Sequence, residues 1–200
     1  MNTAELSRFF HCAAQYPAPF QARRNSMLSE GGYHDAAVLL AVVRRESQWQ
    51  ILLTRRADTL RRHTGQIALA GGRCDDTDDS PTVTALRETD EETGIAPQYW
   101  QTFPQLPPYY TPSGYSVSPI PAICSDNPKT QPNPEEVAEI FYLPLDFALN
   151  RENYSTRTFQ YSHQSLEVPV LPYLHYDIWG LTAMILYDMA ERYHLHLKAV

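Results

Sequence analysis

The sequence predicts an α+β fold in which a mixed β-sheet is flanked by helices, giving an α/β/α sandwich. Short apolar runs typical of strands are interspersed with two or three segments of helical periodicity, and the two kinds do not alternate strictly. The chain has 200 residues, of which 43% are hydrophobic. This length supports one sizeable core and does not require two domains.

Composition and charge exclude several classes of function. The formal net charge of -7 argues against a general nucleic-acid-binding protein, because such proteins usually carry a basic excess. Three widely separated cysteines, Cys12, Cys74 and Cys124, favour reduced thiols over a disulfide framework. The first residues lack the pattern of a signal peptide, and no apolar stretch is long enough to span a bilayer. We therefore expect a cytoplasmic protein that binds neither nucleic acid nor membranes.

Residues 1–30 are expected to form an N-terminal helix and a connector that flank the core, and residues 31–200 form a single domain. Leu6 and Phe9 belong to the apolar face of this helix, and Pro17 marks the connector. The segment reads as a flank or a lid of the domain.

The first strands of the sheet are predicted from apolar and β-branched residues. Two such runs, residues 36–43 and 50–53, are separated by a polar turn and form a hairpin. A third short run, residues 67–69, leads into a glycine loop at Gly71 and Gly72.

The clearest helix covers residues 80–93. Ser80 is a good N-cap, Pro81 suits the first helical position, and Gly94 can adopt the left-handed conformation that ends a helix. An apolar stripe that includes Val83 is expected to face the core, with the glutamates elsewhere on the helix.

The second half of the chain contains further strands and a terminal helix. Residues 104–121 are rich in Pro, Tyr and Ser and form a loop on the substrate side. The remaining elements are strands at residues 117–124 and 137–143, a hairpin of residues 157–161 and 166–170, and a C-terminal helix containing Ile178, Leu181, Ile185 and Met189.

An acidic cluster on the predicted helix carries the strongest functional signal. Glu88 lies one turn from Glu91 and Glu92, so three carboxylates can converge, and a divalent cation such as Mg²⁺ or Mn²⁺ would relieve their repulsion. Arg87, four residues before Glu91, can hold a carboxylate. Gly72 allows a backbone carbonyl to approach the same ion. The alternative is a solvated acidic helix face.

The segment of residues 72–95 resembles the Nudix box, Gly-x5-Glu-x7-Arg-Glu-U-x-Glu-Glu-x-Gly-U, in which U is aliphatic. It departs from that pattern in three ways: the spacing from Gly72 to Asp79 is one residue longer than in the box, Asp79 or Asp78 stands in place of the box glutamate, and Thr89 stands in place of an aliphatic residue. The resemblance implies a single Nudix-like hydrolase domain whose metal ligands are Glu88, Glu91, Glu92 and Gly72. Glu88 would also orient or deprotonate water, supported by Arg87.

Sequence outside the box resembles the coenzyme A pyrophosphatase branch of the Nudix hydrolases. Upstream this likeness rests on Leu52-Leu53-Thr54-Arg55-Arg56, Leu60, His63, Gly65-Gln66, Asp75 and Asp78. Downstream it rests on Leu106-Pro107-Pro108, Gly114-Tyr115, Glu135-Glu136-Val137 and Trp179-Gly180-Leu181-Thr182-Ala183. Leu69-Ala70 stands where that branch usually has Phe-Pro.

Basic and polar residues upstream of the glycines are candidates for binding the substrate. The candidate set is Arg55, Arg56, Arg61, His63, Gln66 and, further on, Tyr115. Clustered arginines in an acidic protein suit a 3′-phosphate and a diphosphate. A solubilising turn, a purely structural histidine and a tyrosine-rich loop that packs on itself are the competing interpretations.

A later acidic residue is expected to complete the site. Glu136 is the candidate for an additional metal ligand or for the base that positions water, and Glu135 and Glu139 compete for this role. Alternatively, these acids only decorate a strand edge.

These features predict a metal-dependent pyrophosphohydrolase that cleaves coenzyme A or a derivative to 3′,5′-ADP and 4′-phosphopantetheine or its acyl form. One alternative is a Nudix hydrolase of another nucleoside diphosphate derivative, such as ADP-ribose. A second alternative is a non-catalytic module that binds a nucleotide. The expected partner is a small nucleotide substrate, and a homodimer is left open.

Overall fold

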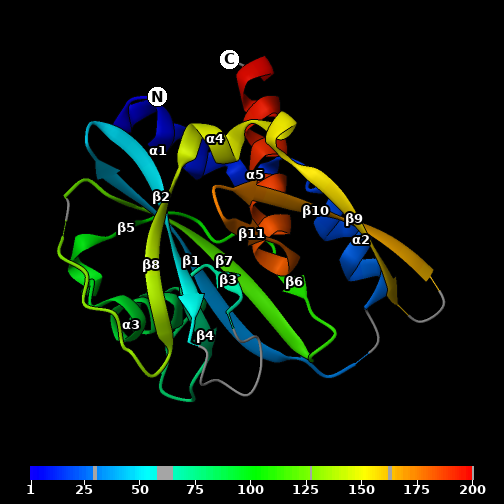
Figure 1. Ribbon diagram of the computed structural model, residues 1–200, viewed down its shortest axis with the longest axis horizontal. Helices are drawn as coiled ribbons and strands as arrows, with labels where there is room; N and C mark the ends of the chain where they lie inside the picture. The colour runs from blue at the N-terminus through cyan, green and yellow to red at the C-terminus, as the bar shows by residue number, and fades with distance from the viewer. Residues whose placement is uncertain (29–30, 58–64, 127, 162–163, 200) are drawn as a thin grey trace.

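The computed structural model describes residues 1–199 apart from 29–30, 58–64, 127 and 162–163. It confirms the predicted fold class, because a mixed sheet is flanked by helices (Figure 1). The helices are α1 (Thr3–Cys12), α2 (Pro19–Met27), α3 (Pro81–Thr93), α4 (Leu145–Leu149) and α5 (Gly180–Ala199), with short 3-10 helices η1 (Ala13–Gln15), η2 (Pro97–Tyr99) and η3 (Arg151–Asn153). The strands are β1 (His34–Arg45), β2 (Gln48–Arg56), β3 (Ile67–Ala68), β4 (Gly71–Arg73), β5 (Gln101–Thr102), β6 (Tyr109–Tyr110), β7 (Tyr115–Cys124), β8 (Val137–Pro144), β9 (Ser155–Tyr161), β10 (Gln164–Tyr173) and β11 (Tyr176–Ile178).

Within the described residues, eight strands form one sheet. Its central path is β3-β2-β1-β7-β5, while β4 pairs with β1, β6 with β7 and β8 with β2. Strands β1 and β7 run parallel, from His34 beside Tyr115 to Val43 beside Cys124, and the other pairs in this sheet are antiparallel. A parallel pair needs a long crossover, and α3 lies in this one.

Both faces of the sheet are covered, because side chains alternate along β1. Leu39 packs with Ala85 of α3 in a core on one face. Leu40, the next residue, packs in the larger core on the other face, together with Phe10 of α1 and Met189 of α5. The helices α1 and α5 therefore form one outer layer of the sandwich and α3 forms the other.

The β1–β2 hairpin is longer than its sequence pattern predicted. Its register brings Arg45 opposite Gln48, which leaves a two-residue turn of Glu46 and Ser47. Both turn residues have positive φ, 48° and 65°. Two positive φ values are characteristic of the tight turns that match the twist of a hairpin, so the strands extend into the segment expected to be a loop.

The predicted N-terminal connector contains a second helix, α2, which begins at Pro19. The carboxylate of Asp188 on α5 accepts hydrogen bonds from the amides of Phe20 at 3.2 Å and Gln21 at 2.9 Å, in the first turn of α2. It also accepts one from the hydroxyl of Tyr109 at 2.8 Å. A buried acid near the C-terminus thus caps a helix near the N-terminus.

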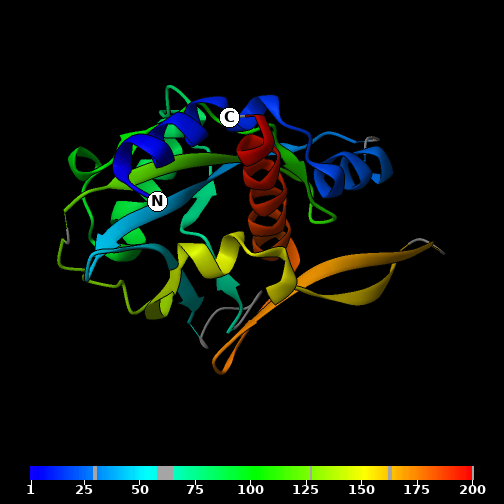
Figure 2. The same ribbon diagram turned by 90° about the horizontal axis from the view of Figure 1, so that it is seen from above.

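The late hairpin of β9 and β10 extends from the body of the molecule as an arm (Figure 2). Strand β11 adds to it, so Ile178 lies in a strand and α5 begins at Gly180, two residues later than the first apolar position of the predicted helix. Among the described residues, no helix combines the length and the apolar character needed to cross a membrane.

Candidate active site

Helix α3 is fixed at both ends by the residues that predicted it. The hydroxyl of Ser80 accepts from the amide of Val83 at 3.3 Å. Gly94 ends the helix at φ 72°, and its amide donates to the carbonyl of Asp90 at 2.7 Å. The prediction that Val83 faces the core is wrong, because this residue is 41% exposed.

The buried side of α3 is formed by small and polar residues instead of an aliphatic stripe. Ala85 is fully buried, and the hydroxyl of Thr89 donates to the carbonyl of Ala85 at 2.7 Å. Glu92 is only 3% exposed, whereas the side chains of Glu88 and Glu91 are 17% and 52% exposed. The acidic cluster therefore extends from the core to the surface. Glu92 occupies a buried position of the helix at which an apolar residue was expected.

Arg87 is the hub of the acidic cluster. Its Nη1 atom donates to Glu88 at 3.0 Å and to both carboxylate oxygens of Glu91 at 3.3 Å. Its Nε and Nη2 atoms donate to the two carboxylate oxygens of Asp78 at 3.1 and 2.9 Å. The hydrogen bonds with Asp78 are the main reason that the pKa of Arg87 is raised. One guanidinium thus holds three carboxylates in place.

The structure distinguishes Asp78 from Asp79, which the sequence left as alternatives. Asp78 contacts Arg87 and accepts from the hydroxyl of Thr84 at 2.9 Å, while Asp79 is exposed. The hydrogen bonds with Arg87, followed by a backbone hydrogen bond at Asp75, hold the pKa of Asp78 well below its usual range. The extra residue of the motif therefore lies between Asp78 and Arg87, and the prediction that it lies between Gly72 and Asp79 is wrong.

Replacing Asp78 should weaken both the fold and the site. Asp78→Asn keeps the shape but removes the charge facing Arg87, so we expect unfolding free energy to fall by about 1–2 kcal/mol and activity to fall about tenfold or more. Because the folded-state pKa is depressed, the stability difference is complete above about pH 4 and shrinks as the pH falls through the folded-state pKa. Urea unfolding at several pH values measures it, with Asp79→Asn as control; equal losses in both variants would contradict the assignment.

Glu92 is a buried carboxylate with incomplete pairing. Its Oε1 atom lies 4.0 Å from Nη1 of Arg56, and its Oε2 atom is buried with no hydrogen-bond partner among the described residues. Burial raises the pKa of Glu92 to about 8; Arg56 opposes this, and the charges of Glu136 and Glu88 add to it. A buried oxygen of this kind needs a further partner, and a cation can be one.

Gly72 brings the backbone of β4 against the Glu88 carboxylate. A Cβ atom at Gly72 would lie 2.5 Å from the carboxylate atoms of Glu88. The glycine was expected in a loop, but it lies in a strand that pairs with Ala37 of β1. Its missing side chain leaves room for the carboxylate and for an ion beside it.

Glu135, Glu136 and Glu139 were the candidates for the additional site acid. Of these three, Glu136 is the one whose charge acts on the glutamates of α3. Its charge raises the pKa of Glu88 and of Glu92, in each case after the larger effect of burial. Glu139 faces elsewhere, because it accepts from the hydroxyl of Tyr176 at 2.6 Å. Glu135 is exposed and its amide donates to the side chain of Asn133 at 3.1 Å.

The cluster has the chemistry of a divalent metal site. Its donors are all oxygens, as Mg²⁺ and Mn²⁺ prefer, and one of them is the unpartnered oxygen of Glu92. In the part of the chain that is described, no three His, Cys, Asp or Glu side chains stand close enough together to hold an ion as they are. Glu88 and Glu91 instead contact Arg87, so an ion would compete with this guanidinium for them.

A cleft of about 490 Å³ adjoins the cluster. Gly72 and Arg56 line one end of it, and these residues touch Glu88 and Glu92 respectively. Trp179 and the first turn of α5 also line the cleft. The cleft therefore adjoins the acidic cluster through Gly72 and Arg56.

The predicted binding residues are distributed unequally around the cleft. Arg56, Gln66 and Tyr115 line it. Arg55 lies in a separate hollow of about 260 Å³, where its Nε atom is 3.5 Å from Glu139. Arg61 and His63 lie outside the described residues. Adjacent residues of a strand point to opposite faces, which separates the two neighbouring arginines.

Arg24 and Trp179 are among the cleft residues that were missed as site candidates. Arg24 reaches the cleft from α2, and Trp179 reaches it from the segment before α5. Trp179 belongs to a run that resembles the coenzyme A branch, so the signal for it was present. Arg24 carries no local signal, because only the tertiary packing of α2 brings it to the cleft.

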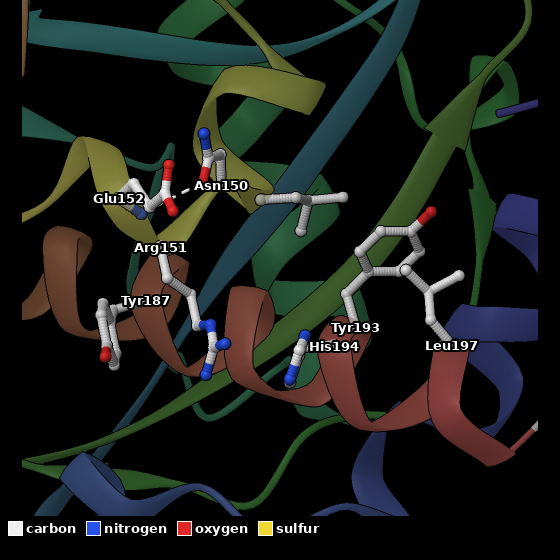
Figure 3. Close-up of a pocket in the computed structure, with 8 residues that line it drawn as sticks. Asn150, Arg151, Glu152, Tyr187, Tyr193, His194 and Leu197 are labelled. Carbon is white, nitrogen blue, oxygen red and sulfur yellow. Dashed lines mark hydrogen bonds between the residues drawn. The ribbon is translucent and has the colours of Figure 1, made fainter.

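A further hollow of about 360 Å³ lies on the other side of α5, between that helix and η3 (Figure 3). Arg151, Tyr193 and Leu197 are among its lining residues. The guanidinium of Arg151 is bonded to Glu191 at 3.1 Å. This hollow is lined neither by the acidic cluster nor by Gly72 and Arg56, which lie beside that cluster, so it does not belong to the same site.

Comparison with known proteins agrees with this geometry. The NUDIX domain family matches residues 32–162. The chain is 40% identical to the "Uncharacterized Nudix hydrolase NudL" of Salmonella paratyphi B over 172 residues, 86% of this chain and 89% of the relative. It is also 40% identical to the protein of the same description in Photorhabdus laumondii over 165 residues, 82% of this chain and 87% of the relative.

Solved structures with the same fold come from more distant proteins. A Caenorhabditis elegans Ap4A hydrolase in a binary complex aligns with a TM-score of 0.53 at 15% identity, covering 84% of this chain and 99% of that chain. The MutT protein of Methanosarcina mazei aligns with a TM-score of 0.51 at 18% identity, covering 82% and 97%. At these identities the likeness concerns the fold alone.

Proposed function

Because this chain belongs to the NUDIX family and is a Nudix hydrolase, we propose that it hydrolyses the diphosphate of coenzyme A or a coenzyme A derivative. The products are 3′,5′-ADP and 4′-phosphopantetheine or its acyl form. The observation that carries the reaction class is that Glu88 and Glu92 lie beside Gly72 and Arg56, two residues that line the cleft. The coenzyme A assignment is supported by the sequence likeness on both sides of the motif.

The carboxylates have two tasks, ion binding and proton acceptance, and Glu88 is a candidate for both. Glu88, Glu91, Glu92 and the carbonyl of Gly72 would hold Mg²⁺ or Mn²⁺, and the bound ion would neutralise phosphate charge and acidify a water molecule. Glu88 or Glu136 accepts the proton of the attacking water. The water oxygen bonds to phosphorus, the bridging P–O bond breaks, and the bridging oxygen leaves with the second phosphate.

The other cleft residues bind and position. Arg56 presents a buried Nε atom that has no hydrogen-bond partner among the described residues, and this donor suits a phosphate oxygen. Gln66 and Tyr115 line the same cleft. Arg87 acts through Glu88 and Glu91, whose orientation it fixes, and is therefore a positioning residue.

A product assay tests the substrate. The purified protein is incubated with coenzyme A, acyl-coenzyme A, ADP-ribose and NADH, with Mg²⁺ or Mn²⁺, and the products are separated by chromatography. We expect 3′,5′-ADP from coenzyme A and its thioesters, at a higher kcat/KM than for the other compounds. Equal or faster cleavage of ADP-ribose would defeat the coenzyme A assignment, and absence of any diphosphatase activity would indicate a binding module.

The two neighbouring arginines should differ in effect. Arg56→Ala removes a charged donor at the cleft, so we expect the KM for coenzyme A to rise about tenfold or more. Arg55→Ala, on the opposite face of β2, should raise it less. Comparing coenzyme A with dephospho-coenzyme A shows which phosphate is read, because an equal loss on both substrates would exclude contact with the 3′-phosphate.

A further inference from the structure

An apolar chamber of about 240 Å³ lies beside the substrate cleft. Met27 and Leu28 form its wall on α2, Phe159 and Val168 form the wall on the β9–β10 hairpin, and Met184 lies on α5. Both α2 and the hairpin extend on the same side of α5, so they can enclose a space between them (Figures 1 and 2). Val168 and Met184 are buried, which makes the inner end of the chamber apolar.

The chamber adjoins the cleft. Four residues line both spaces: Arg24, Pro112, Trp179 and Gly180. The ring of Trp179 stacks on Phe159 with centroids 5.8 Å apart and planes 11° from parallel. This aromatic pair gives the passage a flat apolar wall. A ligand whose diphosphate lies at Gly72 can therefore extend past Trp179 into the chamber.

We propose that this chamber binds the acyl chain of a coenzyme A thioester, which makes acylated forms the preferred ligands. The inference rests on the proposed function and deepens it. The nucleotide, the diphosphate and the amides of coenzyme A all need polar partners, and burying an amide without one costs free energy. An alkyl chain has no such need.

The polar groups at the chamber are few and lie where they do not oppose an alkyl chain. Gln160 is exposed. The guanidinium of Arg24 is directed to the carbonyl of Tyr110 and to the sulfur of Met184, at 3.4 Å from the latter. Two methionines in the walls, Met27 and Met184, can adjust to chains of different shape.

Binding of a chain-length series tests the proposal. Coenzyme A and its acetyl, butyryl and hexanoyl thioesters are titrated by calorimetry without added divalent cation. For the wild type we expect the Kd to fall about fourfold for each methylene buried, until the chamber is full. Met27→Trp fills the chamber and should remove this dependence. Phe159→Ala removes part of the wall and should weaken it, and it supplies the same test if Met27→Trp does not fold.

A matched control introduces a tryptophan at a position outside the chamber. Leu197→Trp changes an exposed residue at the hollow beyond α5 (Figure 3), and it should keep the wild-type dependence on chain length. A wild-type Kd that is independent of chain length would overturn the proposal. The proposal would also be overturned if Met27→Trp weakened the binding of free and acylated coenzyme A equally, because the chamber would then hold the pantetheine arm.

The same titration separates this inference from the proposed function. If affinity rises with chain length but neither coenzyme A nor its thioesters are hydrolysed with Mg²⁺ or Mn²⁺, the proposed reaction fails and the chamber assignment stands. If hydrolysis occurs with no dependence of affinity on chain length, the reaction stands and the chamber assignment fails.

Discussion

Glu92→Gln is expected to lower metal-dependent turnover by about a hundred- to ten-thousandfold without unfolding the protein. The substitution keeps the shape of a side chain that is 3% exposed, and it removes the charge that would bind a cation. Because the Oε2 atom of Glu92 is buried without a partner among the described residues, the metal-free variant should be at least as stable as the metal-free wild type. Activity assays and thermal unfolding by circular dichroism measure the two effects.

A control on the same helix distinguishes this role from a general effect of charge. Asp90→Asn removes a carboxylate only two residues away, and it should retain most of the activity. Mg²⁺ should raise the unfolding temperature of the wild type and of Asp90→Asn, but much less that of Glu92→Gln. Retained turnover in Glu92→Gln would remove this residue from the site.

Gly72→Ala should separate activity from folding in a second way. The new methyl group would meet the carboxylate of Glu88 at 2.5 Å, and a side-chain end can move aside. We therefore expect near-normal stability but about a hundredfold loss of activity, because Glu88 leaves its place beside the backbone of β4.

The neighbouring glycine provides the comparison. At Gly71 a Cβ atom would lie 2.2 Å from the carbonyl oxygen of Ala37, and this glycine has φ +152°. The obstruction is backbone, which cannot rotate away, so Gly71→Ala should lower the unfolding free energy by more than about 2 kcal/mol. If Gly72→Ala were the more destabilising and the more active of the two, the placement of Glu88 against β4 would be wrong.

Much of the fold could be predicted because its signals are local. Ser80 and Gly94 determine the ends of α3 through their own side-chain and backbone chemistry, so the helix was predicted to within one residue. The strands β1 and β8 were similarly evident from short apolar runs. The fold class followed from the order of these elements.

The parts of the site that could not be predicted from the sequence are determined by tertiary contacts. Asp78 and Asp79 are neighbours with the same chemistry, and only their placement against Arg87 distinguishes them. Arg55 and Arg56 read as one basic patch in sequence, although strand alternation sends them to different faces. Arg24 reaches the cleft only because α2 packs on α5, and no local sequence pattern encodes this packing.

Asp188 joins two helices, α2 and α5, that lie apart from the acidic cluster in sequence. The segment matched by the NUDIX family, residues 32–162, contains the glutamates of α3, while α2 and α5 lie outside it. One carboxylate joins these two outlying helices. Under the proposed function, substitutions that alter the packing of α2 on α5 would change which ligands bind. The same substitutions would leave the catalytic carboxylates in place.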